Sequence, residues 1–279
     1  MNERWLLRRT PSSAFLQRMP EVHPLLAKVL YARKFDTPTA ARAFLFMHAA
    51  LGDPLSLPDM LTAVERICRA VEEGERIAIY GDFDTDGITA TALLVSALEG
   101  LGAQVIPYIP DRLEEGYGLN KAALEALRGG GIALVITVDC GIRSSEEVRY
   151  AREIGLDLII TDHHTVPAEL PPALAVINPK REDSPYPFKE LAGVGVAYQL
   201  AQALYGAFSG HTAAEVGEWL DLVALGTVAD MVPLLEENRA LVLKGLERLR
   251  QGARPGLRAL MEVAGVHAEG LGGRGIAFR

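Results

Sequence analysis

Three short motifs hold residue types that bind catalytic metal ions, and each directly follows an apolar stretch. They are DFDTDG at 82–87, VDCG at 138–141 and TDHH at 161–164. Aspartate and histidine with few other ligand types are the donors typical of Mn²⁺, Mg²⁺ or a similar hydrolytic metal, whereas structural zinc favours thiolates. We therefore expect these motifs to form a metal centre.

One competing interpretation is a calcium-binding EF-hand loop, which opens with a similar run of acids. That loop needs a bidentate Glu at its twelfth position. Counted from Asp82, the twelfth residue is Leu93, and the motif follows a predicted strand instead of a helix. The EF-hand is thus excluded. His163 and His164 are adjacent and stand behind an acid, a context that favours a functional role over a buried structural one.

Weaker candidates lie outside these motifs. Asp230 ends a nearly uncharged stretch, where a carboxylate is costly to bury unless it is paired or binds a metal, although by itself an acid at a helix C-terminus is the preferred explanation. Arg112 follows the second predicted strand and could contact a phosphate or form a structural ion pair. Gly193 and Gly195 open a predicted helix whose N–H groups could hold an anion. Cys140 is expected to be a buried filler.

Alternating elements must position these residues. Continuous apolar runs, typical of strands buried on both faces, occur at 76–82, 103–109, 132–139, 157–162 and 173–178. Helical patterns lie between and after them, at 88–101, 119–128, 144–155, 194–206, 213–230, 238–251 and 256–264. This order predicts an α/β fold with a doubly wound, mainly parallel five-stranded sheet. In such a sheet the carboxyl ends of the strands meet, which would bring the acids together.

The remaining segments complete the predicted organisation. Residues 1–58 read as an N-terminal helical segment, 59–235 as the metal-binding domain, and 236–279 as a connector helix with the start of a further domain. The last ten residues, GLGGRGIAFR, read as part of a new strand.

Composition excludes several classes of protein. The 279 residues are 49% hydrophobic, which is ordinary for a globular protein and argues against disorder. Two cysteines cannot form a disulfide framework, and neither a secretory signal nor an apolar run of membrane-spanning length is evident, so we expect a cytoplasmic protein without a membrane partner.

The net charge of −8 by itself argues against a nucleic-acid binder. Its distribution is uneven, however. Residues 1–42 and 239–279 each carry +5, and residues 43–238 carry −18. An acidic centre between basic flanks is either a solvated surface or a set of carboxylates that bound cations neutralise. The position of the acids after apolar strands favours the second interpretation.

Together, DFDTDG, VDCG, TDHH and GTVADMVPL resemble the four motifs of the DHH phosphoesterase superfamily. Longer stretches resemble, within it, the RecJ family of 5′→3′ exonucleases specific for single-stranded DNA. These stretches are IPDRLEEGYGLN, VINPKREDSPYPFKELAGVGVAYQLAQAL and LDLVALGTVADMVPLLEENR. The resemblance runs from about Arg33 to the last residue.

This resemblance implies a two-metal site for Mn²⁺ or Mg²⁺. The positions that match metal ligands are Asp82, Asp84, Asp86, Asp139, His163 and Asp230. Asp139 would bridge the two ions, which gives it a catalytic role, and Asp82 would be a further ligand or near-ligand of the first. His164 would contact the scissile phosphate or stabilise the leaving oxygen, and Asp162 would orient the histidine pair. Arg112 would contact the 5′ end of the DNA.

The implied activity is metal-dependent hydrolysis of single-stranded DNA to mononucleotides in DNA repair and recombination, with a single-strand-binding protein and a helicase as further partners. RecJ proteins continue into a DHHA1 domain and an OB-type domain. We therefore expect this chain to be the N-terminal part of a longer protein, able to bind metal but without a domain that helps to grip the strand. Two alternatives remain. One is another DHH phosphoesterase that cleaves short oligonucleotides, cyclic dinucleotides or pyrophosphate. The other is a scaffold or catalytically weak DNA-binding fragment.

Overall fold

The computed structural model describes residues 9–46, 51–116, 118–208, 210–212, 215–252, 254–267 and 270–278. The chain divides into two units, residues 1–50 and residues 51–279. Parts of the predicted segment 1–58 and the first two residues of the predicted helix 213–230 lie outside the described residues. The domain boundaries expected after residues 58 and 235 stay predictions.

The first unit is helical, as its sequence pattern predicts. It contains α1 (Ser13–Gln17), α2 (Pro24–Ala32) and α3 (Pro38–Phe46). The helices share a small core, made of Phe15, Met19, Val22, Ala27, Leu30 and Ala41. Partly buried aromatic side chains pack around this core, so the unit has an apolar interior of its own.

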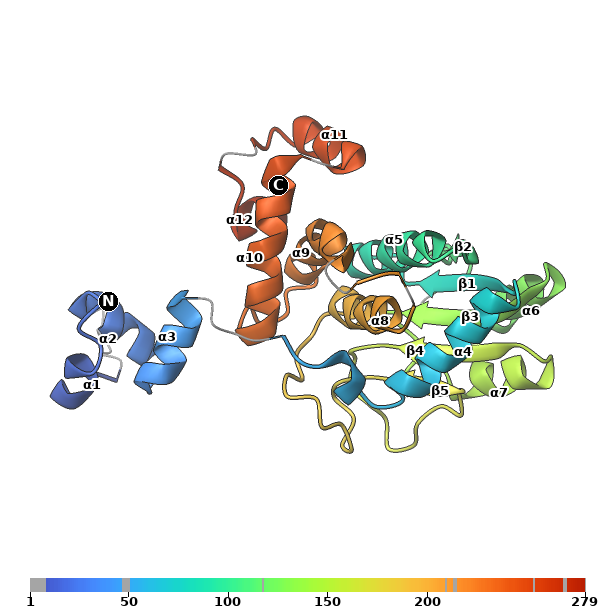
Figure 1. Cartoon of the computed structure of the whole chain (residues 1–279), viewed down its shortest axis with the longest axis horizontal. Coiled ribbons are helices and arrows are strands. Elements are labelled where there is room, and N and C mark those ends of the chain that lie inside the picture. Colours follow the sequence, from blue (N-terminus) through green and yellow to red (C-terminus); the bar gives the residue numbers. More distant parts are fainter. Residues whose placement is uncertain are drawn as a thin grey trace, which may run out of the picture. The chain divides into compact units, whose positions relative to one another are not determined.

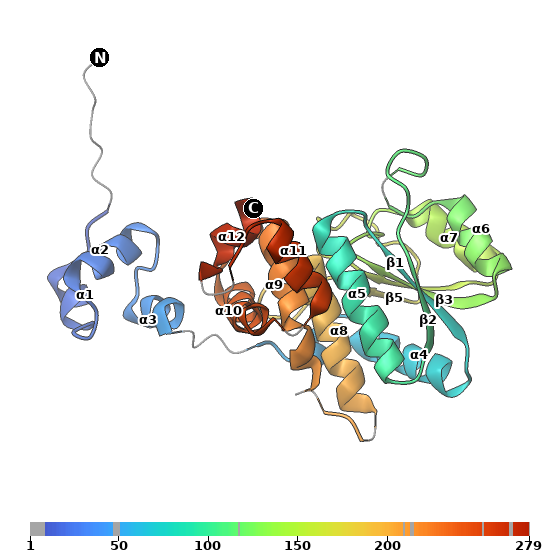
Figure 2. The same cartoon turned by 90° about the horizontal axis from the view of Figure 1, so that it is seen from above.

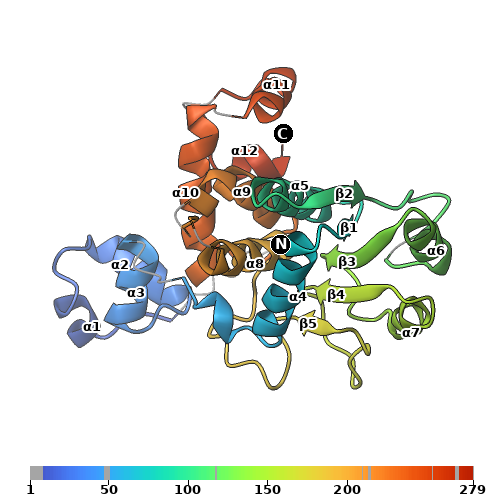
Figure 3. The same cartoon turned by 45° about the vertical axis from the view of Figure 1, so that its right-hand side comes forward.

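The second unit is built on a five-stranded sheet. The strands are β1 (Arg76–Gly81), β2 (Gln104–Tyr108), β3 (Ile132–Val138), β4 (Asp157–Thr161) and β5 (Ala175–Ile177). Their order is β2-β1-β3-β4-β5, and every pair of neighbours is parallel (Figure 3). The predicted strands are thus confirmed to within one or two residues at each end.

Helices cover both faces of this sheet (Figures 1 and 2). One face packs on α4 (Met60–Glu72), α5 (Thr85–Gly100) and α8 (Gly193–Ala207), and the other on α6 (Lys121–Gly129) and α7 (Ser145–Glu153). Side chains of β1 alternate between the two cores, with Ile77 and Ile79 in one and Ala78 and Tyr80 in the other. Burial on both faces explains why each strand is a continuous apolar run, and the doubly wound α/β fold is confirmed.

The strand order also fixes where a ligand can bind. From β1 the chain passes to β2 on one side, whereas β3 pairs with β1 on the other side. The connections therefore diverge between β1 and β3, and in open α/β sheets ligands bind outside the carboxyl ends of the strands at such a switch point.

The remaining segments are mostly helical, and they correct two expectations. The predicted helix 213–230 is a 3₁₀ turn, η2 (Glu215–Trp219), followed by α9 (Leu220–Ala229). Two further helices follow, α10 (Glu236–Gln251) and α11 (Pro255–Val263), and a short 3₁₀ turn, η1 (Pro54–Ser56), precedes α4.

The new strand expected at the C-terminus is wrong, because this segment forms the short helix α12 (Gly273–Phe278). Leu271 and Ile276 join an apolar cluster with side chains of α9 and α10. A strand needs a neighbouring strand for its backbone hydrogen bonds, whereas a helix satisfies them within itself. Packing against helices therefore favours the helix. Among the described residues, no helix is both long and apolar enough to span a membrane.

Candidate metal centre

The acids predicted from the sequence come together at the carboxyl end of the sheet, beside the switch point. Asp82 follows β1, Asp139 follows β3 and Asp162 follows β4, and these three strands are adjacent. Each of the three residues is at most 3% exposed. The parallel topology thus collects carboxylates that are separated by whole strand-helix units in the sequence.

The turn from β1 into α5 carries the first three acids. Asp84 is the N-cap of α5, where its Oδ1 accepts a hydrogen bond from the N–H of Gly87 at 3.0 Å. Asp86 lies in the first turn of the helix, where the helix dipole favours negative charge. A Cβ on Gly87 would lie 2.5 Å from the main-chain oxygen of Asp82, so this tight turn requires glycine.

Asp86 is fixed by the start of another helix. Its Oδ2 accepts from the N–H of Gly193 at 2.6 Å, and its Oδ1 accepts from the N–H of Val194 at 2.9 Å. These N–H groups belong to the first turn of α8, where no carbonyl within the helix can accept from them. Burial, followed by repulsion from Asp139, raises the pKa of Asp86 well above its usual range. The carboxylate is therefore oriented, but its negative charge is poorly compensated.

Asp139 occupies the centre of the cluster in an unusual backbone conformation. Its φ is +62°, in the left-handed region that few residues other than glycine and asparagine or aspartate adopt. A Cβ on Gly193 would lie 2.6 Å from both the Cβ and the Oδ1 of Asp139, so only glycine lets α8 approach this closely. Burial raises the pKa of Asp139 to about 9, and the charge of Asp84 adds to the effect.

The TDHH turn after β4 is organised by its aspartate. Asp162 Oδ1 accepts from the main-chain N–H groups of His163 and His164, and lies 2.8 Å from the His164 Nδ1. Its Oδ2 accepts from the N–H of Ile142 at 3.0 Å. Burial would raise the pKa of Asp162, but the hydrogen bond and charge of His164 outweigh it and lower the pKa. The same hydrogen bond raises the pKa of His164 to about 9, so this half-exposed ring is cationic at neutral pH.

His163 points into the carboxylates instead. Its Nε2 lies 3.1 Å from Asp139 Oδ1, 3.7 Å from Asp230 Oδ2 and 3.9 Å from Asp86 Oδ2. Asp230 reaches this position as the C-cap of α9. One turn earlier, a Cβ on Gly226 would lie 2.9 Å from Asp86 Oδ1, so this glycine lets α9 approach the site.

These residues form three overlapping groups that could hold a metal ion, and within each group one donor atom per residue lies within 4.8 Å of the others. The groups are Asp82, Asp84 and Asp139, then Asp86, His163 and Asp230, and then Asp139, His163 and His164. Asp139 belongs to two of the groups, as a residue shared between two ions must. All of the predicted metal ligands are therefore brought together.

The donor atoms also fit a bound cation. Within the described part of the chain, Asp139 Oδ1, both ring nitrogens of His163 and Asp230 Oδ2 are buried and make no well-aligned hydrogen bond, although His163 Nε2 lies 3.1 Å from Asp139 Oδ1. Leaving such atoms unpaired costs free energy. Carboxylate oxygens with one or two imidazoles suit Mn²⁺ or Mg²⁺, and a divalent cation would relieve the repulsion between the acids.

The predicted substrate-binding residues lie on Phe83 of the first motif and in the first turn of α8. The exposed guanidinium of Arg112 stacks over the ring of Phe83, 5.1 Å from its centroid, and Phe83 stands between Asp82 and Asp84 in the sequence. The N–H of Gly193 is already used by Asp86, and Gly195 is buried against Leu191. Substrate binding by Arg112, Gly193 and Gly195 stays a prediction.

Sequence reasoning missed Asn178, which directly follows β5 and is fully buried. Its Nδ2 donates to the main-chain oxygen of His164 at 3.0 Å, and its Oδ1 accepts from the N–H of Lys180 at 2.8 Å. The signal was available, because Asn178 ends a predicted strand as Asp82, Asp139 and Asp162 do. The search for metal ligands does not select Asn178, because an amide is a weaker metal ligand than a carboxylate.

Known proteins share these features. A family model described as the N-terminal domain of the DHH family matches residues 76–227. The single-stranded-DNA-specific exonuclease RecJ of Bacillus subtilis (strain 168) is 45% identical over 265 residues, which cover 94% of this chain and 33% of that protein. Its counterpart from Escherichia coli (strain K12) is 46% identical over 226 residues, which cover 77% of this chain and 39% of that protein.

Solved structures agree. A crystal structure of exonuclease RecJ bound to manganese has a TM-score of 0.72 and 40% identity, and the match covers 80% of this chain and 55% of that one. RecJ from Thermus thermophilus in complex with Mn²⁺ has a TM-score of 0.79 and 35% identity, over 97% of this chain and 38% of that one. The chain thus spans less than half the length of the two curated relatives.

Proposed function

Because this chain belongs to the DHH family, we propose that its metal centre hydrolyses the phosphodiester bonds of single-stranded DNA from the 5′ end. The observation that carries the proposal is the set of buried, unpaired donor atoms around His163, at the switch point of the sheet. The likeness to RecJ proteins, which are named as single-stranded-DNA-specific exonucleases, supports the choice of substrate.

The ions would be Mn²⁺ or Mg²⁺, as in the related RecJ structures. In our proposal the residues that hold them are Asp82, Asp84, Asp86, Asp139, His163 and Asp230. When bound, two such ions lower the pKa of a water molecule and polarise the phosphoryl oxygens. Asp139 would be the residue shared by both ions: Asp139 and His163 each belong to two of the three ligand groups, and of the two only the carboxylate has two oxygens to offer.

The protein would supply orientation and positive charge for the phosphate. Asp162 holds the His164 ring through Nδ1, so that the other ring nitrogen is directed away from it. A cationic, half-exposed His164 beside the ligands can donate a hydrogen bond to a phosphate oxygen or to the leaving 3′ oxygen. Arg112, stacked on Phe83, would contact the phosphates at the 5′ end of the strand.

The cellular role follows the same reasoning. We propose that the protein acts in DNA repair and recombination, in the cytoplasm, with a single-strand-binding protein and a helicase as partners. Single-stranded DNA is the substrate that the likeness to RecJ supports.

The test compares the protein with Mn²⁺ and the protein in EDTA. Single-stranded DNA labelled at the 5′ end, incubated with Mn²⁺, should release labelled mononucleotides, whereas blunt duplex DNA and samples in EDTA should not. Asp139→Ala should abolish release while circular dichroism stays unchanged. A preference for dinucleotides, cyclic dinucleotides or pyrophosphate over longer strands would contradict the proposal.

A further inference from the structure

A lysine beside the metal centre is fixed in place by the residue that also holds His164. The segment after β5 begins with Asn178, Pro179 and Lys180. The buried Asn178 side chain makes two hydrogen bonds in opposite directions, to the His164 oxygen and from the Lys180 N–H. Since a carbonyl only accepts and an N–H only donates, the orientation of the amide group is unambiguous. One side chain therefore joins the two segments.

Arg181, the residue after Lys180, holds this turn through its side-chain hydrogen bonds. Arg181 is 8% exposed, and its Nη1 donates to Asp59 Oδ2 at 2.6 Å and to the Val176 oxygen at 2.7 Å. Its Nε and Nη2 donate to the two carboxylate oxygens of Asp183 at 3.0 and 2.7 Å. With Asn178 and Arg181 both fixed, the backbone of Lys180 has little freedom, and an ordered backbone lowers the entropic cost of using its side chain.

Lys180 lies beside the TDHH turn, because the single Asn178 side chain spans the gap between the Lys180 N–H and the His164 oxygen. The Lys180 side chain is 28% exposed. The ion pair that Lys180 forms is a loose one, 3.8 Å from Glu190 Oε2, and the Glu190 side chain is 49% exposed. Exposed pairs of this kind contribute about 0–1 kcal/mol. Such a weak ion pair can be exchanged for a contact between the Lys180 ammonium and another anion.

We propose that Lys180 binds a phosphate of the substrate beside the metal centre, and that Asn178 is a positioning residue that sets the spacing between Lys180 and His164. The proposal rests on the function proposed above. An anionic strand that approaches a cluster of carboxylates needs positive charge from the protein as well as from metal ions. A lysine serves as a point charge for phosphate and needs no bidentate geometry.

The decisive measurement is the salt dependence of DNA binding. Binding of the protein to a single-stranded phosphorothioate oligonucleotide, which keeps its charge and resists Mg²⁺-dependent hydrolysis, is followed by fluorescence anisotropy from roughly 50 to 200 mM KCl at fixed Mg²⁺. Loss of one phosphate contact should reduce the slope of log K against log salt by about 0.7. Lys180→Gln should show this reduction and bind about tenfold more weakly at low salt. An unchanged slope would overturn the proposal.

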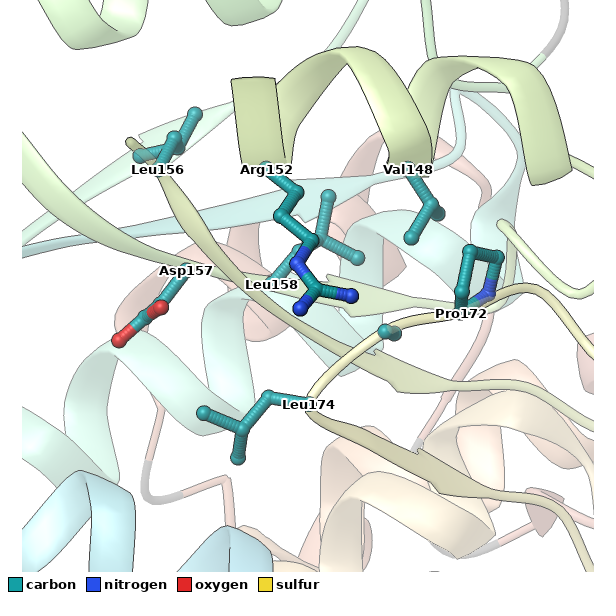
Figure 4. A pocket seen from close by; sticks show the side chains of 8 residues that line it. Val148, Arg152, Leu156, Asp157, Leu158, Pro172 and Leu174 are labelled. Carbon is teal, nitrogen blue, oxygen red and sulfur yellow. The ribbon is translucent and has the colours of Figure 1, made fainter. Parts of the chain in front are cut away.

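Arg152 provides a matched control. It lies on α7 in a pocket of about 320 Å³, beside Leu156 and Leu158 at the amino end of β4, which is the opposite end of the sheet from the metal centre (Figure 4). Arg152→Gln removes the same unit of charge without disturbing the site. Its slope should equal that of the wild type. An equal loss of slope in both variants would mean a general charge effect and would also overturn the proposal.

Two substitutions separate the hydrogen bonds of Asn178. A serine can accept from the N–H two residues further on but is too short to reach the His164 oxygen. Asn178→Ser should therefore lower kcat and keep the salt slope, whereas Asn178→Ala should lower both. An alanine variant with normal kcat and slope would refute the positioning role. If the Asn178 variants fail to fold, the salt slopes of the Lys180 and Arg152 variants still test whether Lys180 binds a phosphate.

Failure of the proposed nuclease function can be distinguished from failure of the Lys180 proposal. A wild-type protein that binds single strands but releases no nucleotide would contradict the nuclease activity, and the salt slope would still test Lys180.

Discussion

Gly193→Ala tests whether the metal centre depends on the close approach of α8. Gly193 is the first residue of α8, and alanine is favoured over glycine in a helix by up to about 1 kcal/mol. Helix propensity alone therefore predicts a slightly more stable protein. The structure predicts the opposite, because the new methyl group would lie 2.6 to 2.7 Å from three atoms of the Asp139 side chain.

The size of the effect follows from this contact. To restore an ordinary separation of at least 3.4 Å, Asp139 or the start of α8 must move by roughly 0.8 Å. Overpacking of this kind costs about 1–3 kcal/mol. A movement of α8 would also disturb the hydrogen bond from Gly193 to Asp86, so two predicted metal ligands are displaced together. We expect Mn²⁺ affinity to fall about tenfold or more.

The assay combines urea unfolding in EDTA with calorimetric titration of Mn²⁺. Gly206→Ala is the matched control, since Gly206 lies on the same helix and its added methyl group would meet no atom within 4 Å. The control should keep Mn²⁺ affinity and gain up to about 1 kcal/mol of unfolding free energy. If Gly193→Ala is stabilised like the control and binds Mn²⁺ normally, the close-approach argument is refuted.

Three further predictions concern charge in the site. Burial raises the pKa of Asp139 to about 9, so the metal-free protein should lose stability as the pH rises from about 4 towards 9. Asp139→Asn should remove this loss and be more stable than the wild type at pH 8 by about 1 kcal/mol or more in EDTA; identical pH dependence in urea unfolding would contradict it. Asp162→Asn should lower the pKa of His164 from about 9 towards about 6.5, which an NMR titration of the ring measures directly; an unchanged pKa would show that another group holds the proton. Phe83→Leu removes the stacking under Arg112, worth about 0.5–1 kcal/mol, so KM for single-stranded DNA should rise about threefold with little change in kcat, and an unaltered KM would exclude the contact.

The sheet and the position of the acids are readable from the sequence because both depend on simple patterns. Strands buried on both faces are continuous apolar runs, and parallel strands all end at the same edge. Asp82, Asp139 and Asp162 are thus placed near one another without coordinates. The sequence predicts a strand where the structure has the small helix α12, because a short apolar run fits either element. Only the packing partners of the segment select the helix.

Asp230 shows where pattern reasoning stops. By itself it is indistinguishable from an acid at a helix end, and the family resemblance was needed to propose it as a ligand. The structure brings its Oδ2 to 3.7 Å from the His163 Nε2, through a helix that follows the sheet in the sequence. No local pattern encodes that approach, because it depends on how α9 packs against α5 and α8.

The sequence by itself determined the succession of strands and helices, the acidic edge and the type of chemistry, because residue periodicity and side-chain donors are local properties. Only the tertiary structure decided which donors lack partners, why Gly87, Gly193 and Gly226 must be glycine, and that Asn178 joins His164 to Lys180. These are distances between segments that lie far apart in the chain. They are set by close packing of helices on the sheet, where tenths of an ångström separate a contact from a collision.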